Sequence, residues 1–219
     1  MKNIQIMVNG RLEEIPKAPG EMLSEVLREG LGLTGTKIGC SELECGSCTV
    51  LLDGDPVLSC VFPAAKADGA SISTIEGLAD GDLHPLQKSF VDYGAVQCGF
   101  CIPGQIMSAA GMLSRNPDPS VAEVRHALKD TLCRCAGYPT IERAVLAAAE
   151  ALRTGEELQP FDIPITSDNA VIGQQVVRPA RRVGARPGAR PWCLRSSLPQ
   201  RKHVTRRFPP SRSHYVPYP

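Results

Sequence analysis

The sequence predicts an α+β protein in which a small sheet domain is followed by a helical domain and a basic tail. Short alternating apolar runs, separated by Asn-Gly and Asp-Gly turns, extend to about residue 76, and helical periodicity dominates residues 84–154. Residues 1–168 contain all 23 acidic residues of the 219-residue chain, whereas residues 169–219 contain 11 basic residues and no acidic ones. Such a division of charge indicates a domain with a tail.

The first part of the chain alternates strand and helix signals. Residues 4–15 are expected to form a β-hairpin, because apolar residues alternate around a two-residue Asn-Gly turn. Residues 21–33 place apolar side chains on one helical face, and the helix is expected to stop at Gly30. A second hairpin is expected over residues 48–60, and one more short strand over residues 70–78.

Four helices are expected in the second part, over residues 84–94, 103–116, 120–130 and 140–155. Pro103 suits the first position of a helix, where a backbone N–H is not needed. Ser120 and Glu123 form a capping-box pattern. Thr140 is expected to cap the last helix, which Gly155 would end. Four short helices in succession predict a small bundle.

The composition bears on the compartment. No apolar run is long enough to span a membrane, and the first residues lack the apolar core of a secretory signal. We therefore expect a cytoplasmic protein. Because the cytoplasm is reducing, nine cysteines point to metal ligation or redox chemistry rather than to a disulfide framework.

One set of cysteines has the C-x4-C-x2-C…C spacing of a plant-type [2Fe–2S] site. It consists of Cys40, Cys45, Cys48 and Cys60. Three thiolates would come from one loop, in which Gly39 and Gly46 allow tight turns, and the fourth from the end of the next strand. Structural zinc is the alternative, but it usually takes two short Cys pairs, so the spacing favours iron.

A second set comprises Cys98 and Cys101 before one predicted helix and Cys133 and Cys135 before another. Helix N-termini favour anions, so two of them can hold an anionic cluster. Spacing alone leaves zinc and iron–sulfur equally open here. The neighbouring plant-type site favours a second cluster, because two clusters form an electron path. Cys193, in the tail, has no partner in spacing and is interpreted as a free thiol or as an accident of the tail sequence.

Three motifs, "LTGTKIGCSELECGSCTV", "QCGFCIPG" and "LCRCAGY", resemble the small iron–sulfur subunit of the xanthine dehydrogenase/aldehyde oxidoreductase family of molybdenum hydroxylases. The resemblance extends over residues 2–158. It implies a β-grasp, plant-type ferredoxin domain over residues 1–76 and a four-helix-bundle [2Fe–2S] domain over residues 83–158. The Pro- and Arg-rich tail, residues 159–219, is expected to be disordered.

The resemblance also implies a function without catalytic residues in this chain. It would pass single electrons from molybdopterin on a large partner chain, through two [2Fe–2S] clusters, to an FAD-binding medium subunit or another acceptor. Gln97 and Cys135 would contact the molybdopterin, and the complex would oxidise a purine, an aldehyde or an N-heterocycle. The alternative is a zinc-stapled binding module whose basic tail contacts nucleic acid. Because the tail has no RNA-binding motif and few aromatic residues, we do not expect a nucleic-acid partner.

The chain departs from the family pattern at a few positions. Leu43 stands where the family usually has glycine, and a positive φ at this position would cost of order 1 kcal/mol. Ser47 replaces the usual alanine, and its hydroxyl can donate to a cluster sulfur. In the tail, "NAVIGQQVVRP" resembles the opening of the family's large chain, and the resemblance stops after Pro179. The tail is therefore either a frameshifted remnant of a fused large subunit or a functional extension.

Overall fold

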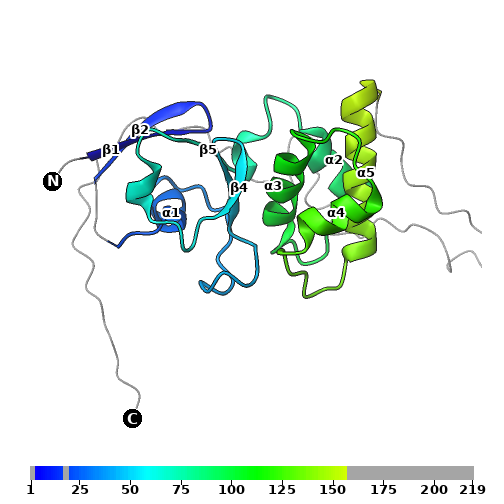
Figure 1. The fold of residues 1–219 in the computed structure, drawn as a ribbon, viewed down its shortest axis with the longest axis horizontal. Coiled ribbons are helices and arrows are strands. Elements are labelled where there is room, and N and C mark those ends of the chain that lie inside the picture. The colour runs from blue at the N-terminus through cyan, green and yellow to red at the C-terminus, as the bar shows by residue number, and fades with distance from the viewer. Residues whose placement is uncertain (1–2, 17–19, 157–219) are drawn as a thin grey trace, which may run out of the picture.

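The computed structural model describes residues 3–16 and 20–156. The predictions for the tail and for Cys193 lie outside these residues. Figure 1 shows an α+β protein, as predicted, in which a sheet half lies beside a helical half. Among the described helices, none is long and apolar enough to cross a membrane.

The sheet half contains a mixed five-stranded sheet. Its strands are β1 (Asn3–Val8), β2 (Arg11–Pro16), β3 (Thr49–Leu52), β4 (Asp55–Leu58) and β5 (Ser71–Ser73). They lie in the order β2-β1-β5-β3-β4. β1 and β5 are parallel, and the other neighbouring pairs are antiparallel. The last residues of this half therefore return to the centre of the sheet, between the two hairpins.

Both predicted hairpins are confirmed, β1–β2 and β3–β4. The type I′ turn, one of the two-residue hairpin turns that match the strand twist, needs positive φ at both central positions. Asn9 and Gly10 have φ of 50° and 78°, and Asp53 and Gly54 have φ of 51° and 91°. The turns that the sequence predicts are thus formed by the residue types that tolerate this conformation best.

The helix that follows β2 differs from the prediction. Only α1 (Leu23–Glu25) is α-helical, and it continues as the π-helical turn η1 (Val26–Gly30). The Leu31 N–H donates to the Val26 carbonyl at 2.9 Å, a bond that spans five residues instead of four. The predicted apolar face is confirmed, since Leu27 is fully buried. A regular helix was predicted because periodicity over so few turns does not distinguish the two helix types.

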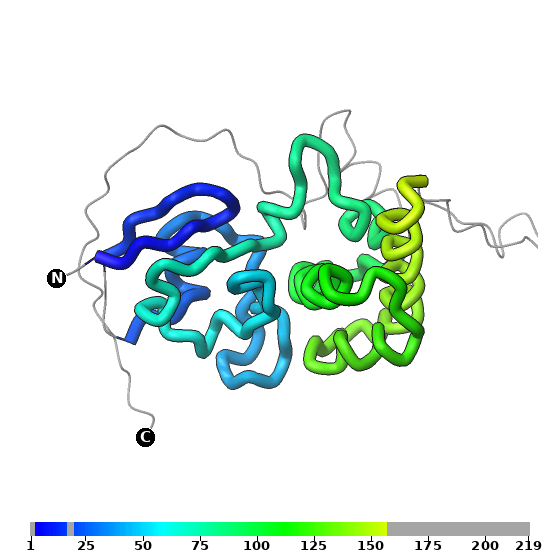
Figure 2. Tube along the Cα trace, turned by 45° about the horizontal axis from the view of Figure 1, so that its top comes forward, coloured from blue at the N-terminus to red at the C-terminus, as the bar shows by residue number. Residues whose placement is uncertain are grey.

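The described part of the helical half contains four α-helices. One short 3-10 turn leads into it from β5, and another lies within the sheet half, between β4 and β5. The elements are η2 (Ala64–Ala67), η3 (Ile75–Gly77), α2 (Pro85–Asp92), α3 (Ile102–Leu113), α4 (Val121–Leu128) and α5 (Tyr138–Thr154). α3 packs against β3 and β4, whereas α5 packs against α2 and α4. Figure 2 shows the segment between η3 and α2 crossing from one half to the other. α3 is therefore the helix that faces the sheet.

Helix ends follow local chemistry. Ser120 and Glu123 form the predicted capping box on α4, and Gly155 ends α5 with φ of 73°. The sequence did not predict the cap of α2: His84 Nδ1 accepts the backbone N–H of Leu86 at 3.2 Å. Burial lowers the pKa of His84, which keeps the imidazole neutral and able to accept this bond.

Two predicted helix starts are displaced. α5 begins at Tyr138 with Gly137 as its N-cap, so the prediction of a Thr140 cap is wrong. The Thr140 hydroxyl instead donates to the Gly137 carbonyl at 2.8 Å. Pro139 fits in the first turn, where its missing N–H costs nothing, and this lets the helix extend toward the preceding cysteines. α3 begins one residue earlier than predicted, at Ile102.

Two hydrophobic cores share β3. Val50 is buried in the core between the sheet and α1, whereas Leu51 belongs to the core of the helical half. Neighbouring residues of a strand point to opposite faces, so one strand can serve both cores. Ile75 of η3 also packs into the helical core. The two halves are therefore packed together through β3 and η3, not only connected by a linker.

Candidate metal centres

The first set of cysteines is brought together by the β3–β4 hairpin. Because Thr49 pairs with Leu58, Cys48, one residue before Thr49, and Cys60, two residues after Leu58, come to the same end of the hairpin. Ser59 ties this end, since its backbone N–H and its hydroxyl donate to the Cys48 carbonyl at 3.3 and 2.7 Å. All four cysteines of this set are free thiols: Cys40, Cys45, Cys48 and Cys60.

The thiols of this set interact with one another. The Cys40 sulfur accepts the backbone N–H groups of Glu42 and Cys45, each at 3.4 Å, and these bonds lower the pKa of Cys40. Burial raises the pKa of the Cys48 thiol to about 12, and the adjacent thiols of Cys60 and Cys45 oppose its ionisation further. A bound metal cation would reverse this effect, because it stabilises thiolates.

The loop wraps closely around the Cys45 sulfur. The Ser47 hydroxyl lies 3.0 Å from Cys45 Sγ, and Ser47 is buried. A Cβ atom on Gly39 would lie 2.9 Å from the same sulfur, too close for any side chain there. Gly46 has φ of 66°. The structure thus places the Ser47 hydroxyl beside a sulfur, as the sequence suggested, and explains both glycines by space and conformation.

Leu43 is strained. Its φ is 66°, in the region where residues with a side chain lose about 1–2 kcal/mol per residue. The side chain is 61% exposed, so its burial offsets little of this cost. The structure therefore confirms that the position where the family usually has glycine needs a positive φ.

We expect Leu43→Gly to raise the free energy of unfolding by up to about 1 kcal/mol, the relieved strain less the chain entropy of the added glycine. The midpoint of thermal unfolding measures it. Leu12→Gly is the matched control, because Leu12 is equally exposed, at 63%, but lies in β2. There, glycine should destabilise the protein. Destabilisation by both substitutions would contradict the strain at Leu43.

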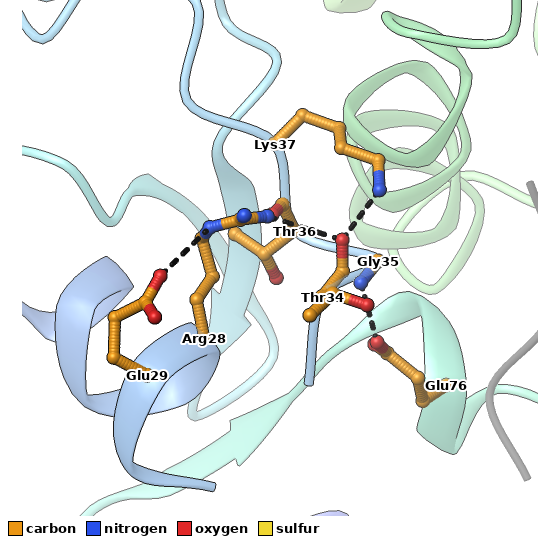
Figure 3. Close-up of polar contacts among 7 residues, drawn as sticks. All are labelled: Arg28, Glu29, Thr34, Gly35, Thr36, Lys37 and Glu76. Carbon is orange, nitrogen blue, oxygen red and sulfur yellow. Dashed lines mark hydrogen bonds and ion pairs between the residues drawn. The ribbon is translucent and has the colours of Figure 1, made fainter. Parts of the chain in front are cut away.

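Two cationic side chains hold the segment that precedes Cys40 (Figure 3). The Arg28 guanidinium of η1 donates to the carbonyl groups of Thr34 and Thr36, at 3.1 and 2.6 Å. The Lys37 ammonium also donates to the Thr34 carbonyl, at 2.5 Å. Backbone carbonyls in this loop are thus bound by charged donors, which form stronger hydrogen bonds than neutral ones.

A carboxylate holds the other side of this segment. The Gly35 N–H donates to Glu76 at 2.7 Å (Figure 3). The Thr74 hydroxyl donates to the second oxygen of the same carboxylate, also at 2.7 Å. A Cβ on Gly35 would lie 2.4 Å from the Ile75 side chain. Sequence reasoning missed Glu76, since nothing local links η3 to a loop 41 residues earlier. Gly35, five residues before Cys40, was the available signal.

The second set lies at the N-termini of α3 and α5, as predicted. Cys101 is the N-cap of α3. The Cys133 sulfur accepts the Gly137 N–H at 3.4 Å, at the start of α5. The Cys133 N–H donates to the Tyr138 hydroxyl at 2.9 Å, a contact that the sequence did not predict although tyrosine ends the "LCRCAGY" motif. These bonds fix the second pair of cysteines against the helix that they precede.

The four thiols of the second set also influence one another. Burial raises the pKa of the Cys101 thiol to about 12, and the neighbouring thiols of Cys133 and Cys98 contribute. Hydrogen bonds from Cys98 lower the pKa of Cys135, as does a weaker one from Cys133. Cys101 and Cys133 are buried, Cys135 is half-buried and Cys98 is exposed. One side of the set is therefore open to solvent.

Gln97 lies beside this open side. Its amide nitrogen is 3.2 Å from where a Cβ on Gly137 would be, and the Cys133 sulfur is 3.7 Å from the same point. The Gln97 side chain is exposed. Gln97 thus reaches the second set, on which Cys98 is exposed. Its predicted contact with molybdopterin stays a prediction.

The donor chemistry of both sets fits an iron–sulfur cluster. Each set offers four free thiols, which is the ligand set of a [2Fe–2S] cluster. Within the part of the chain that the structure describes, no group of three or more His, Cys, Asp or Glu side chains is arranged to hold a metal ion. Each iron of a two-iron cluster takes only two of the four thiolates, so pairwise contacts are the relevant ones.

Known proteins match both halves. A family model described as "2Fe-2S iron-sulfur cluster binding domain" matches residues 6–72, and one described as "[2Fe-2S] binding domain" matches residues 74–146. The boundary between the two matches falls at β5 and η3, where the sheet half ends. Each matched region contains one complete set of four cysteines.

The chain is 47% identical over 148 residues to the nicotinate dehydrogenase small FeS subunit of Eubacterium barkeri, covering 67% of this chain and 94% of that one. It is 45% identical over 146 residues to the xanthine dehydrogenase iron-sulfur-binding subunit of Escherichia coli O157:H7, covering 65% and 91%. The structure resembles a chain of quinoline 2-oxidoreductase from Pseudomonas putida 86, with a TM-score of 0.67, 47% identity and coverage of 71% and 98%. The chain therefore belongs to the small [2Fe–2S] subunits of the xanthine dehydrogenase/aldehyde oxidoreductase, or molybdenum hydroxylase, family.

Proposed function

We propose that this chain is the electron-transfer subunit of a molybdenum hydroxylase complex. It passes single electrons from the molybdopterin centre of a large partner chain to a flavin or another acceptor, and does not touch the substrate. The observation that carries this proposal is the pair of four-thiol sets, each with contacts among its own members. Two such sets in one chain suit an electron path better than a single structural site does.

The proposed ligands are Cys40, Cys45, Cys48 and Cys60 for one cluster, and Cys98, Cys101, Cys133 and Cys135 for the other. Each bound cluster would supply a one-electron redox centre. The chain orients the sulfurs through backbone N–H groups, such as those of Glu42 and Gly137. It also excludes water from the buried thiols. Hydrogen bonds to sulfur and burial are the means by which a protein tunes the potential of such a centre.

We assign the two sites to two domains. Residues 1–76 would form a β-grasp, plant-type ferredoxin domain, and residues 83–158 a four-helix-bundle domain. The mixed sheet covered by α1 and the four helices around one core support this assignment. A cytoplasmic location is supported by the eight free thiols in the described residues, which suit a reducing compartment.

We further propose that the open side of the second set faces the molybdopterin of the large subunit. Gln97 and Cys135 would contact the pterin. Phe100 and Leu132 are large apolar residues left 45% and 55% exposed, which suits burial against a partner. The first set would face an FAD-binding medium subunit or another acceptor. By likeness to relatives named for nicotinate and xanthine, the substrate of the complex would be an N-heterocycle or a purine.

Purified, reduced protein should show two distinct [2Fe–2S] signals by electron paramagnetic resonance, with about four irons and four acid-labile sulfides per chain. The signals should differ, because the Ser47 hydroxyl reaches the first set whereas the second is partly open to solvent. Stoichiometric zinc without labile sulfide would contradict the proposal and favour the zinc-stapled binding module.

A further inference from the structure

The two cysteine loops touch through their backbones. The Leu132 N–H donates to the Cys45 carbonyl at 3.0 Å. Cys45 belongs to the first set, and Leu132 immediately precedes Cys133 of the second. One hydrogen bond therefore joins a residue that carries a ligand of one site to the neighbour of a ligand of the other.

The peptide unit that makes this contact is held at both ends. Its N–H, from Leu132, donates to Cys45, and its carbonyl, from Thr131, accepts the side-chain amide of Gln105 at 2.8 Å. A peptide unit is planar, so binding its oxygen also orients its N–H. Hydrogen bonds in such a chain polarise and strengthen one another. Gln105 thus acts directly on the group that connects the two loops.

Two glycines allow the start of α3 and the two cysteine loops to pack together, because neither glycine has a side chain. A Cβ on Gly46 would lie 2.1 Å from the Asp130 carbonyl, and a Cβ on Gly104 would lie 2.4 Å from the Gly46 carbonyl. Both distances are far below van der Waals contact. The start of α3 can therefore pack directly on the first cysteine loop, and Gln105 follows from that helix into the space between the loops.

Burying the Gln105 side chain in this position lowers the stability of the fold. It is fully buried, and within the described residues its amide oxygen has no hydrogen-bond partner. A buried polar atom without a partner costs stability that an apolar side chain of similar size would not cost. Because the Thr131 carbonyl can only accept, the amide cannot be turned round to satisfy its oxygen instead. The single bond to Thr131 is what the polar head provides here.

We propose that Gln105 is a positioning residue for electron exchange between the two sites. It fixes the Thr131–Leu132 peptide so that the contact with Cys45 stays closed. In this exchange one site loses one electron and the other gains it, and no bond forms or breaks, so the chain contributes through the separation and contact of the sites. The inference rests on the proposed function and adds a residue to it.

The test compares Gln105→Met with Gln87→Met in the full chain carrying both clusters. Gln87 is a matched control: it is also buried, and its amide donates at 3.0 Å to the Ile75 carbonyl and not to the peptide that joins the two cysteine loops. We expect Gln105→Met to slow electron equilibration between the sites severalfold after pulsed one-electron reduction. The magnetic interaction between the two reduced centres should weaken, and the amide of Leu132 should exchange with deuterium faster. Gln87→Met should match the wild type in all three.

Wild-type equilibration, magnetic interaction and exchange in Gln105→Met would overturn the inference. If that variant does not fold, Gln105→Asn serves in its place, because its shorter amide fills most of the same space but does not reach Thr131. Gln105→Asn should show the same slower equilibration, weaker magnetic interaction and faster deuterium exchange. Wild-type values of all three would again overturn the inference. Iron and sulfide are measured first in the wild type. A wild-type chain without two clusters would overturn the proposed function, and this inference with it, before any variant is compared.

Discussion

Cys48→Ser should remove one of the two iron–sulfur clusters and leave the other intact. Cys48 is buried beside the thiols of Cys45 and Cys60, where a serine hydroxyl would stay protonated and bind iron poorly. The second set shares no thiol with the first. Iron should fall from about four to about two per chain, with one of two paramagnetic signals lost.

Two other substitutions complete this experiment. Cys135→Ser should give the reciprocal loss, because Cys135 belongs to the second set. Cys193→Ser, which lies outside the described residues, should change neither signal. Loss of both signals in Cys48→Ser, or retention of both, would show that the assignment of ligands to two separate sites is wrong.

The same variants test the order of the electron path once the large subunit is present. With Cys48→Ser, substrate should still reduce the second site, and onward transfer to the acceptor should stop. The reason is the open face of the second set, beside Gln97, which we propose lies against the pterin. If substrate no longer reduces an intact second site in Cys48→Ser, the path runs in the opposite order.

Gly104→Ala should lower the free energy of unfolding by about 1–2 kcal/mol, although helix propensity alone predicts a gain of nearly 1 kcal/mol. The new methyl group would lie 2.4 Å from the Gly46 carbonyl and 3.0 Å from the Ser47 Cα. The Gly46 carbonyl cannot move freely, because the backbone and hydroxyl of Thr49 both donate to it, at 3.1 and 2.7 Å. The two halves must separate slightly, and packing between them is lost.

Gly30→Ala is the control for this prediction. Gly30 ends η1, and a Cβ there would meet nothing within 4 Å, so alanine should leave stability unchanged or raise it slightly. Denaturant midpoints of the two variants measure the difference. A gain of stability in Gly104→Ala would mean that the start of α3 does not pack on the first cysteine loop as tightly as the structure indicates.

Several features of the fold could be predicted because their causes are local. An Asn-Gly or Asp-Gly pair forms a hairpin turn through its own φ angles, and the Ser120–Glu123 capping box closes within one turn. The cysteine spacings belong to the same class, since three cysteines of the first set lie in a single loop. Gly155 ended its helix as expected. None of these features depends on what packs against it.

Other local features were mispredicted or left open, because they depend on contacts with other segments that the sequence pattern does not show. α5 starts at Tyr138, whose hydroxyl accepts the Cys133 N–H, a contact with a neighbouring segment that the Thr140 cap pattern does not include. The π-helical turn η1 shares its apolar pattern with an ordinary helix. The sequence predicted strain at Leu43 only if its φ is positive, and the structure gives a φ of 66°.

By itself, the sequence determined the fold class, the family and the eight thiols, because these are written in residue type and in spacing along the chain. Only the tertiary structure decided how the two cysteine loops meet. Leu132 and Cys45 lie far apart in sequence, and their hydrogen bond exists because β3 serves both cores and two glycines admit close packing. Contacts between distant segments depend on the packing of whole elements, which no short motif encodes.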